Sequence, residues 1–209
     1  MGVSVKVFRC GPIDTNCYVV YDENKSAVLV DLEENYDELQ SFIDENGLTV
    51  QMILVTHPHF DHLRGIDSMR KSTGAKVAVA KQCVDYTEDG EAYLEHKSVY
   101  ANSGRIVPDI IFEDGDVLHW DDNLIEVYVG NGHSKADSVF KIENNLFTGD
   151  ALFRGTIGRT DLENGDYGSL VKFVKGLKRF DDDVNVYPGH GGFTTIGAES
   201  HTNKYMMGE

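Results

Sequence analysis

The segment Thr56-His57-Pro58-His59-Phe60-Asp61-His62 places four potential metal ligands within six consecutive residues. It follows a short apolar run that begins at Met52 and predicts a strand buried on both faces. Burying three unpaired imidazoles and a carboxylate would cost several kcal/mol, so a core is an unfavourable place for them. On an extended backbone the side chains of His57 and His59 point the same way. Asp61 and His62 are expected on a turn, where their side chains can point toward a second metal position. The pattern therefore favours two metal ions of a kind that imidazole and carboxylate bind, such as zinc, iron or manganese.

Three further candidate ligands follow other predicted strands. His133 comes after the strand IEVYV, Asp150 comes after NLF, and His190 follows the strand that contains Val186 and Tyr187. Each lies where a strand ends in a glycine-containing turn, which is a common place for a site carried by a rigid scaffold. Together with the first four they make seven ligands, the right number for two metals if Asp150 bridges. The remaining histidines, which do not share this setting, are expected not to be ligands: His96, His119 and His201.

Strand and helix patterns alternate along the chain. Residues 3–7, 17–21 and 27–30 are expected to form an antiparallel meander. Apolar residues at helical spacing predict one helix that ends at Gly47, a second over residues 65–73 and a late one from Leu170 to Leu177. The pattern is weak over residues 81–108, where a helix or two and an irregular loop are expected.

The second half resumes with short strands and ends, by this interpretation, in a last strand over residues 185–190. Further strands are expected at 76–80, 110–113, 117–120, 124–129, 138–142 and 146–148. No linker or low-complexity segment divides the sequence. The order predicts a single domain over residues 1–209, made of two similar βα-rich halves with helices outside two central sheets.

Charge and cysteine content narrow the function classes. Lys plus Arg is 19 and Asp plus Glu is 35, which gives a net charge of −16. This balance argues against nucleic-acid binding and against an anionic membrane surface, because both need clustered basic residues. The longest apolar stretches are strand-sized, so no membrane span is expected. The three cysteines lack CxxC spacing, which favours a reducing cytoplasm without disulfides.

Motifs along nearly the whole chain resemble those of the metallo-β-lactamase-fold hydrolases, and most of all the small glyoxalase II-like subgroup. They are GPIDTNCY near the start, VTHPHFDH, EDGD, GHS, FTGDALF, IGRTD, and VYPGHG with TTIG. The resemblance implies a four-layer αββα sandwich of two mixed β-sheets flanked by helices, with the metals at one edge of the sheets. It also implies a partition of the ligands: His57, His59 and His133 at metal 1, Asp61, His62 and His190 at metal 2, and Asp150 as the bridge.

Two departures from the family pattern bear on the substrate. Full glyoxalase II enzymes carry a C-terminal helical region that helps to hold glutathione, whereas this chain is expected to have no separate C-terminal substrate domain. The loop after Asp150 reads LFRGTIGRTD, in place of a form with Lys and Tyr that glyoxalase II uses for glutathione. Within this loop Arg154 and Arg159 are candidates for an anionic substrate and Phe153 for a pocket wall. The alternative for Arg159 is an ion pair with Asp161 that braces the loop.

The leading hypothesis is a binuclear metallohydrolase, with zinc as the expected metal and iron or manganese as alternatives. Hydroxide from a water shared by the cations would cleave a small thioester, of the hydroxyacylglutathione type, or a related ester. Asp61 would both bind metal and orient this nucleophile, and Asp14, Asp31 or a backbone carbonyl would support the histidines. Three alternatives remain open: a persulfide dioxygenase with one iron on His57, His133 and Asp150, a lactone hydrolase, and a metal-binding protein without activity. The expected partner is a small molecule, and the sequence leaves the oligomeric state open.

Overall fold

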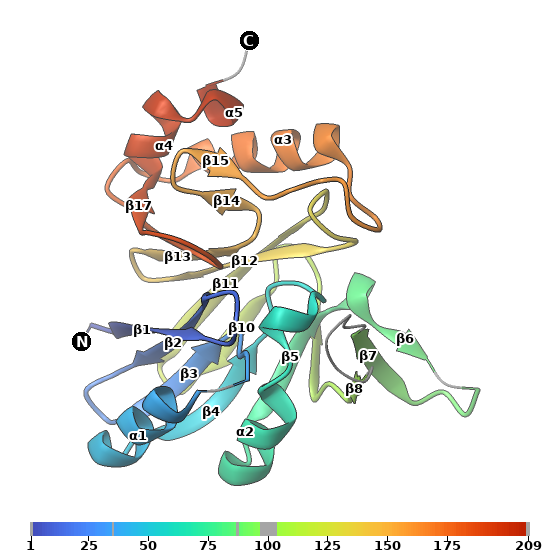
Figure 1. The fold of residues 1–209 in the computed structure, drawn as a ribbon. Helices are drawn as coiled ribbons and strands as arrows, with labels where there is room; N and C mark the ends of the chain where they lie inside the picture. Colours follow the sequence, from blue (N-terminus) through green and yellow to red (C-terminus); the bar gives the residue numbers. More distant parts are fainter. Residues whose placement is uncertain (1, 35, 87, 97–103, 208–209) are drawn as a thin grey trace.

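The computed structural model describes residues 2–34, 36–86, 88–96 and 104–207. Two β-sheets face each other in the middle of the molecule, and helices cover the outer face of each sheet (Figure 1). This arrangement confirms the predicted αββα sandwich. The strands of the first sheet lie within residues 4–112, and those of the second sheet lie within residues 117–195.

The first sheet has the strand order β1-β2-β3-β4-β5-β9. The first three strands form the predicted antiparallel meander, and β3, β4, β5 and β9 run parallel. Helices α1 (Asp37–Asn46) and α2 (Ile66–Thr73) lie on its outer face and end, as predicted, at Gly47 and Gly74, whose φ angles are 61° and 74°. The strand bounds are β1 (Ser4–Cys10), β2 (Thr15–Tyr21), β3 (Ser26–Val30), β4 (Thr49–Leu54), β5 (Lys76–Ala80) and β9 (Ile110–Phe112).

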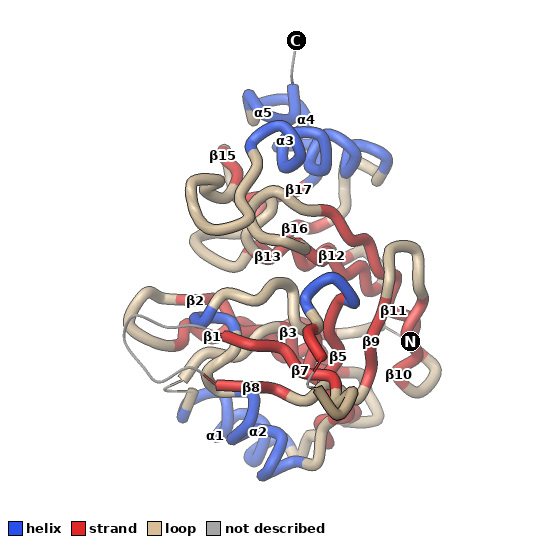
Figure 2. The backbone as a smooth tube through the Cα atoms, turned by 90° about the vertical axis from the view of Figure 1, so that its right-hand side faces the viewer, coloured by secondary structure: helices blue, strands red, loops and turns tan. Residues whose placement is uncertain are grey.

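The second sheet has the order β10-β11-β12-β13-β16-β17 and is also mixed, because β13 and β16 are parallel while their neighbours are antiparallel. Figure 2 shows its helices gathered on the side away from the first sheet. None of the helices in the described ranges is long and apolar enough to cross a membrane. The bounds are β10 (Val117–Trp120), β11 (Asn123–Gly130), β12 (Asp137–Ile142), β13 (Asn145–Gly149), β16 (Asn185–Pro188), β17 (Thr194–Thr195), α3 (Tyr167–Gly176), α4 (Ile196–Thr202) and α5 (Lys204–Met207).

The structure corrects the sequence prediction in two regions. Residues 81–108 were expected to contain a helix or two; their described part instead has a 3₁₀ turn (Lys81–Cys83) and the strands β6 (Asp85–Tyr86), β7 (Ala92–His96) and β8 (Gly104–Ile106). Cross-strand pairing, which is non-local, outweighs the weak local pattern there. Residues 97–103 of the predicted loop lie outside the described part. The strand at 185–188 is not the last one either, because β17 and two short helices follow it.

Aromatic side chains join the inner faces of the two sheets. Phe112 of β9 packs edge-to-face on Phe140 of β12, with ring centroids 5.5 Å apart. Tyr18 of β2 packs in the same way on Phe147 of β13, at 5.3 Å. All four side chains are almost completely buried. Because apolar burial is the main favourable contribution to folding, these contacts hold the sheets, and therefore the strand ends, in a fixed relation.

We expect Phe140→Ala to lower the free energy of unfolding by about 3–5 kcal/mol, because it leaves a cavity between the sheets. The matched control is Leu124→Ala on the neighbouring strand β11, where the side chain is 53% exposed. That change should stay within about 0.5 kcal/mol of the unaltered protein. Urea unfolding followed by circular dichroism measures both, and equal losses would contradict the assignment of Phe140 to the inter-sheet core.

Candidate metal centre

The seven candidate ligands meet at one edge of the two sheets. His57 follows β4, His133 follows β11, Asp150 follows β13 and His190 follows β16. Asp61 and His62 lie on a 3₁₀ turn (Phe60–His62) that continues from the same β4 end. A hydrogen bond from Ser138 N to Thr56 O, 2.7 Å long, joins the end of the first sheet to the second sheet at this point. The structure therefore brings together all the residues that the sequence predicted to be ligands.

The first group consists of His57, His59 and His133, whose ligand atoms lie within 4.8 Å of one another. The rings pack at centroid distances of 4.5 to 4.8 Å. His59 Nδ1 lies only 2.8 Å from His133 Nε2. Two neutral imidazoles can share this contact through one N–H group, or both lone pairs can face one cation. The group has the geometry expected for metal 1.

The second group consists of Asp61, His62 and His190, again with ligand atoms within 4.8 Å. Asp61 Oδ2 is 3.2 Å from His62 Nε2 and 3.1 Å from His190 Nε2. Asp150 lies between the two groups: its Oδ1 is 3.5 Å from His62 Nε2, and its Oδ2 is 3.5 Å from His133 Nε2 and 3.7 Å from His190 Nε2. One carboxylate that faces both groups is the arrangement expected of a bridge.

Hydrogen bonds behind three of the rings determine which ring nitrogen faces the centre. Thr56 Oγ1 donates to Asp31 Oδ2 at 2.7 Å and therefore accepts from His57 Nδ1 at 2.9 Å. His62 Nδ1 donates to the same carboxylate at 2.7 Å. His133 Nδ1 donates to a backbone carbonyl, 2.8 Å away, in the loop that follows β15 (Thr156–Ile157). With the proton on Nδ1, each neutral ring turns its Nε2 lone pair toward the centre.

Three buried polar atoms at this centre have no hydrogen-bond partner among the described residues. They are His57 Nε2, His62 Nε2 and Asp150 Oδ1. An unpaired buried polar atom costs about 1–3 kcal/mol, so three in one place demand a physical reason. A divalent cation would satisfy all of them, since neutral imidazole and carboxylate are its usual ligands. The residues present therefore fit a metal site.

Burial and ring crowding keep the first group neutral. Burial is the largest cause, and it lowers the pKa of His57 well below the usual value. The same cause brings the pKa values of His59 and His133 to about 4. Because metals bind deprotonated imidazole, these histidines are ready to bind at neutral pH without a competing proton.

In the second group, Asp61, His62 and His190, the electrostatic interactions of the side chains outweigh the effect of burial. Burial alone would lower the pKa of His62, but Asp61, Asp31 and Asp150 outweigh it and raise that pKa well above the usual value. Burial would raise the pKa of Asp61, yet the neighbouring His62 and His190 hold it far below its usual range. The carboxylates around His62 thus favour positive charge at this place, and a bound cation would supply it.

Sequence reasoning missed Thr15, Asn16 and Tyr18 of strand β2. Thr15 Oγ1 donates to Asp61 Oδ2 at 3.1 Å. Asn16 Nδ2 and Tyr18 OH both donate to the carbonyl of Pro188, at 2.9 and 2.5 Å, and so fix the turn that carries His190. The sequence did contain a signal for these residues, because Thr15 and Asn16 are polar and begin an otherwise apolar strand. Both side chains are almost fully buried in the structure.

The turn itself requires glycine. A Cβ atom on Gly189 would lie 2.2 Å from Asp150 Oδ1 and 2.8 Å from His62 Cε1. No side chain fits in this space, because the backbone passes directly beside two candidate ligands. The glycine of the PGH sequence is therefore part of the centre.

The predicted substrate-contacting residues fall into two classes. Phe153 lies beside the centre, with its ring centroid 6.2 Å from that of His190, and Arg154 is exposed next to Gly192. Arg159 makes two hydrogen bonds of 2.7 Å to Asp161, and both side chains are largely exposed. Its backbone carbonyl is the acceptor for His133 Nδ1. The structure therefore favours the bracing role for Arg159.

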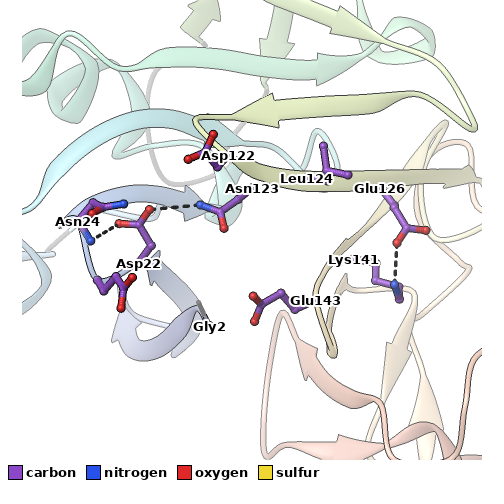
Figure 3. Close-up of a pocket in the computed structure, with 10 residues that line it drawn as sticks. Gly2, Asp22, Asn24, Asp122, Asn123, Leu124, Glu126, Lys141 and Glu143 are labelled. Atoms are coloured by element: carbon purple, nitrogen blue, oxygen red, sulfur yellow. Dashed lines mark hydrogen bonds and ion pairs between the residues drawn. The ribbon is translucent and has the colours of Figure 1, made fainter.

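A cavity of about 360 Å³ lies elsewhere, beside the turn between β2 and β3, and contains none of the seven candidate ligands. Figure 3 shows its carboxylates, with Asp22 hydrogen-bonded to Asn24 and Asn123, and Glu126 paired with Lys141. A second cavity of about 260 Å³ has His59 on its wall. Of these two cavities, the second is therefore the one that adjoins the candidate metal centre.

Comparison with known proteins identifies similar chains. The family model described as "Metallo-beta-lactamase superfamily" matches residues 10–190. The hydroxyacylglutathione hydrolase GloC of Haemophilus influenzae is 28% identical, with 98% of each chain covered. Among solved structures, the BLEG-1 B3 metallo-beta-lactamase is 28% identical with a TM-score of 0.85, covering 98% of this chain and 100% of the other. The protein TTHA1623, solved in a di-iron-bound form, is 26% identical with a TM-score of 0.77, covering 96% and 99%.

We expect Asp31→Asn to weaken divalent-metal binding by about 10- to 100-fold, because an amide has one oxygen. Its NH₂ group would face either the Thr56 N–H, which donates to Oδ1, or the Thr56 hydroxyl and His62 Nδ1, which both donate to Oδ2. Asp22→Asn is the control, since its carboxylate is also buried but caps a turn away from the histidines. Competition with a metal indicator dye measures the affinity. Equal affinities of the two variants would contradict an orienting role for Asp31.

Proposed function

The chain belongs to the metallo-beta-lactamase superfamily, and from this premise we propose that it is a binuclear metallohydrolase that cleaves a small thioester or a related ester. The observation that carries the proposal is the set of three unpaired buried atoms on His57, His62 and Asp150. His57 belongs to the first group of ligands, His62 belongs to the second, and Asp150 faces both. A cation would satisfy all three atoms, which form no hydrogen bond with the described residues.

The proposed ligand assignment follows the two groups. His57, His59 and His133 hold the first cation, and Asp150 is shared between the two. Asp61, His62 and His190 hold the second. Zinc is the proposed metal, because histidine nitrogen with carboxylate oxygen is its common ligand set. The di-iron form of the 26% identical TTHA1623 supports the stoichiometry and keeps iron as an alternative.

When bound, two divalent cations supply Lewis acidity and lower the pKa of water toward about 7, so that hydroxide is available at neutral pH. The chain provides the carboxylate that orients the attacking water. Asp61 is ionised, because the neighbouring imidazoles hold its pKa below the usual range against the effect of burial. Thr15 Oγ1 fixes the rotamer of Asp61 by donating to Oδ2 at 3.1 Å. The carboxylate can then accept a hydrogen bond from the water and orient it at a defined position.

The proposed substrate is a small molecule with a thioester or ester carbonyl. The name of the GloC relative, a hydroxyacylglutathione hydrolase, supports the thioester class. Phe153 lies beside His190, the least buried of the histidines in the second group, and supplies an apolar wall for the substrate. We place the protein in the cytoplasm, which its three buried free cysteines support.

Metal analysis paired with a hydrolysis assay tests the proposal. The purified protein should contain about two equivalents of zinc per chain, and a chelator should abolish hydrolysis of a neutral probe thioester until zinc is added back. Emission spectrometry gives the metal content, and thiol release gives the rate. One iron per chain with oxygen uptake on a persulfide would replace this function by a dioxygenase, and turnover of lactones alone would replace the substrate class.

Asp61→Ala should lower kcat for the probe thioester by at least about 100-fold in a zinc-replete sample, because the group that orients the water is lost. The fold should persist, since Asp61 lies at the sheet edge outside the apolar core. Lys141→Gln is the control: it removes an ion pair with Glu126 in the cavity away from the centre and should leave kcat within about twofold. Unchanged turnover of the Asp61 variant would show that this centre is not the catalyst.

A further inference from the structure

A buried ion pair lies behind the turn that carries Asp61 and His62. Oε1 of Glu33 accepts a hydrogen bond from Arg64 Nε and also contacts Arg64 Nη2. The side chain of Glu33 is completely buried, and that of Arg64 is only 6% exposed. Glu34, whose side chain is 47% exposed, lies 3.1 Å from Arg64 Nη1 and is a weaker partner. The main contact of the arginine is therefore with a carboxylate inside the protein.

Stability alone does not account for this buried pair. Removing two charges from water is costly, and apolar side chains of similar volume often stabilise a buried place equally well or better. Burial raises the pKa of the Glu33 carboxyl, although Arg64 acts in the opposite direction. Oε2 of Glu33 also has no hydrogen-bond partner among the described residues. The benefit of the pair must therefore lie in the geometry that it fixes.

The buried pair is one of several contacts between the residues that follow β3 and the ligand turn. Asp31 Oδ2 accepts from His62 Nδ1 at 2.7 Å. Leu32 N donates to the carbonyl of His62 at 2.9 Å, and Gly65 N donates to the carbonyl of Leu32 at 3.0 Å. The side chains of the buried pair come from the same two segments. The segment that holds His62 is thus fixed at the imidazole, along the backbone and at the buried pair.

Arg64 also closes the ligand turn itself. Its backbone N–H donates to the carbonyl of Phe60 at 3.2 Å, and its guanidinium carbon lies 5.2 Å from the centroid of the Phe60 ring. Phe60 is the first residue of the 3₁₀ turn, and Asp61 is the second. A guanidinium that is held by Glu33 and packs on Phe60 therefore fixes the backbone from which Asp61 projects.

Glu33 contacts a second support of Asp61. A Cβ atom on Gly11 would collide with Cγ of Glu33, so the loop between β1 and β2 packs directly on this side chain. The same loop leads into Thr15, whose hydroxyl donates to Asp61 Oδ2 at 3.1 Å. One buried side chain therefore contacts both the arginine behind the ligand turn and the loop that precedes Thr15.

We propose that Glu33 and Arg64 are positioning residues, which set the affinity of the second group of ligands for its cation and the orientation of Asp61 toward water. The inference rests on the proposed function, because it concerns one of the two cations proposed there. None of the three histidines of the first group lies within the 3₁₀ turn. Loss of the buried pair should therefore weaken the second cation selectively.

Two variants and a control test the proposal. Glu33→Met combined with Arg64→Met replaces both charged side chains by apolar ones of similar length, so no lone charge stays buried. Arg64→Lys keeps the charge but loses the planar group that packs on Phe60. Arg70→Met is the matched control, because Arg70 on α2 pairs with Asp109 at 2.9 Å. Asp109 precedes β9, at the end of the parallel strands opposite to the ligands.

Zinc titration of the metal-free protein against a competing chelator measures a dissociation constant for each of the two ions. In the doubly substituted protein the first constant should stay within about twofold, and the second ion should bind at least about tenfold more weakly. Arg64→Lys should show a smaller loss of the same kind. Arg70→Met should change neither constant, although it also removes an ion pair.

Kinetics at saturating zinc give a second measurement, which a purely structural role would not affect. With both ions bound, Arg64→Lys should lower kcat for the probe thioester by about threefold or more, because Asp61 no longer holds the water in the best orientation. KM should stay within about twofold, since the substrate does not contact the buried pair. Arg70→Met should leave both values unchanged.

The outcomes separate this inference from the proposed function. Unchanged constants for both zinc ions in the doubly substituted protein would overturn the inference and leave the function standing. An equal loss at both ions would show that the pair only supports the fold, which also overturns the inference. Selective weakening of the second ion, without thioester hydrolysis by any of the proteins, would keep the inference and overturn the hydrolase.

Two further results are decisive. A single zinc ion in the unaltered protein would overturn both the binuclear function and the inference. If the doubly substituted protein does not fold, the same criteria apply to Arg64→Lys, which retains the charge opposite Glu33.

Discussion

The carboxylate of Asp31 organises the candidate metal centre. It accepts from the backbone N–H and the hydroxyl of Thr56 and from His62 Nδ1, with all three distances between 2.7 and 2.8 Å. Through the Thr56 hydroxyl it also fixes the ring of His57. One buried charge therefore joins the end of β3 to the end of β4 and sets two imidazole tautomers. The direction of the lone pairs, and with it the ability to bind metal, depends on this network.

The network can only work because the two sheets are rigid. Aromatic contacts such as Phe112 on Phe140 and Tyr18 on Phe147 fix the sheets against each other. The same strand β2 that carries Tyr18 into this core also presents Thr15 and Asn16 to the centre. Core packing and site geometry are thus coupled along one strand. The result is a set of polar atoms held in a buried place that would be unfavourable without a cation.

Charge acts on two scales in this molecule. The net charge of −16 describes the surface as a whole, where solvated carboxylates dominate. The centre is different, because neutral imidazoles face a few carboxylates that a divalent cation can balance. Beside the centre, in the cavity that has His59 on its wall, Lys135 Nζ and Asp85 Oδ2 form an ion pair at 3.5 Å. The sign of the global charge therefore says little about what the site attracts.

The sequence by itself determined the ligand candidates and the fold class. Clustered histidines after an apolar strand, and His133, Asp150 and His190 at strand ends, are local patterns that the chain alone displays. Only the tertiary structure decided which groups stand behind the ligands and what lies beside them. Asp31 and Thr15 come from segments whose proximity to the ligands depends on long-range strand pairing, which no local sequence pattern indicates. For the same reason the β6–β8 hairpins were predicted as helix and loop: their strands are stabilised by cross-strand partners, which a reading of neighbouring residues does not contain.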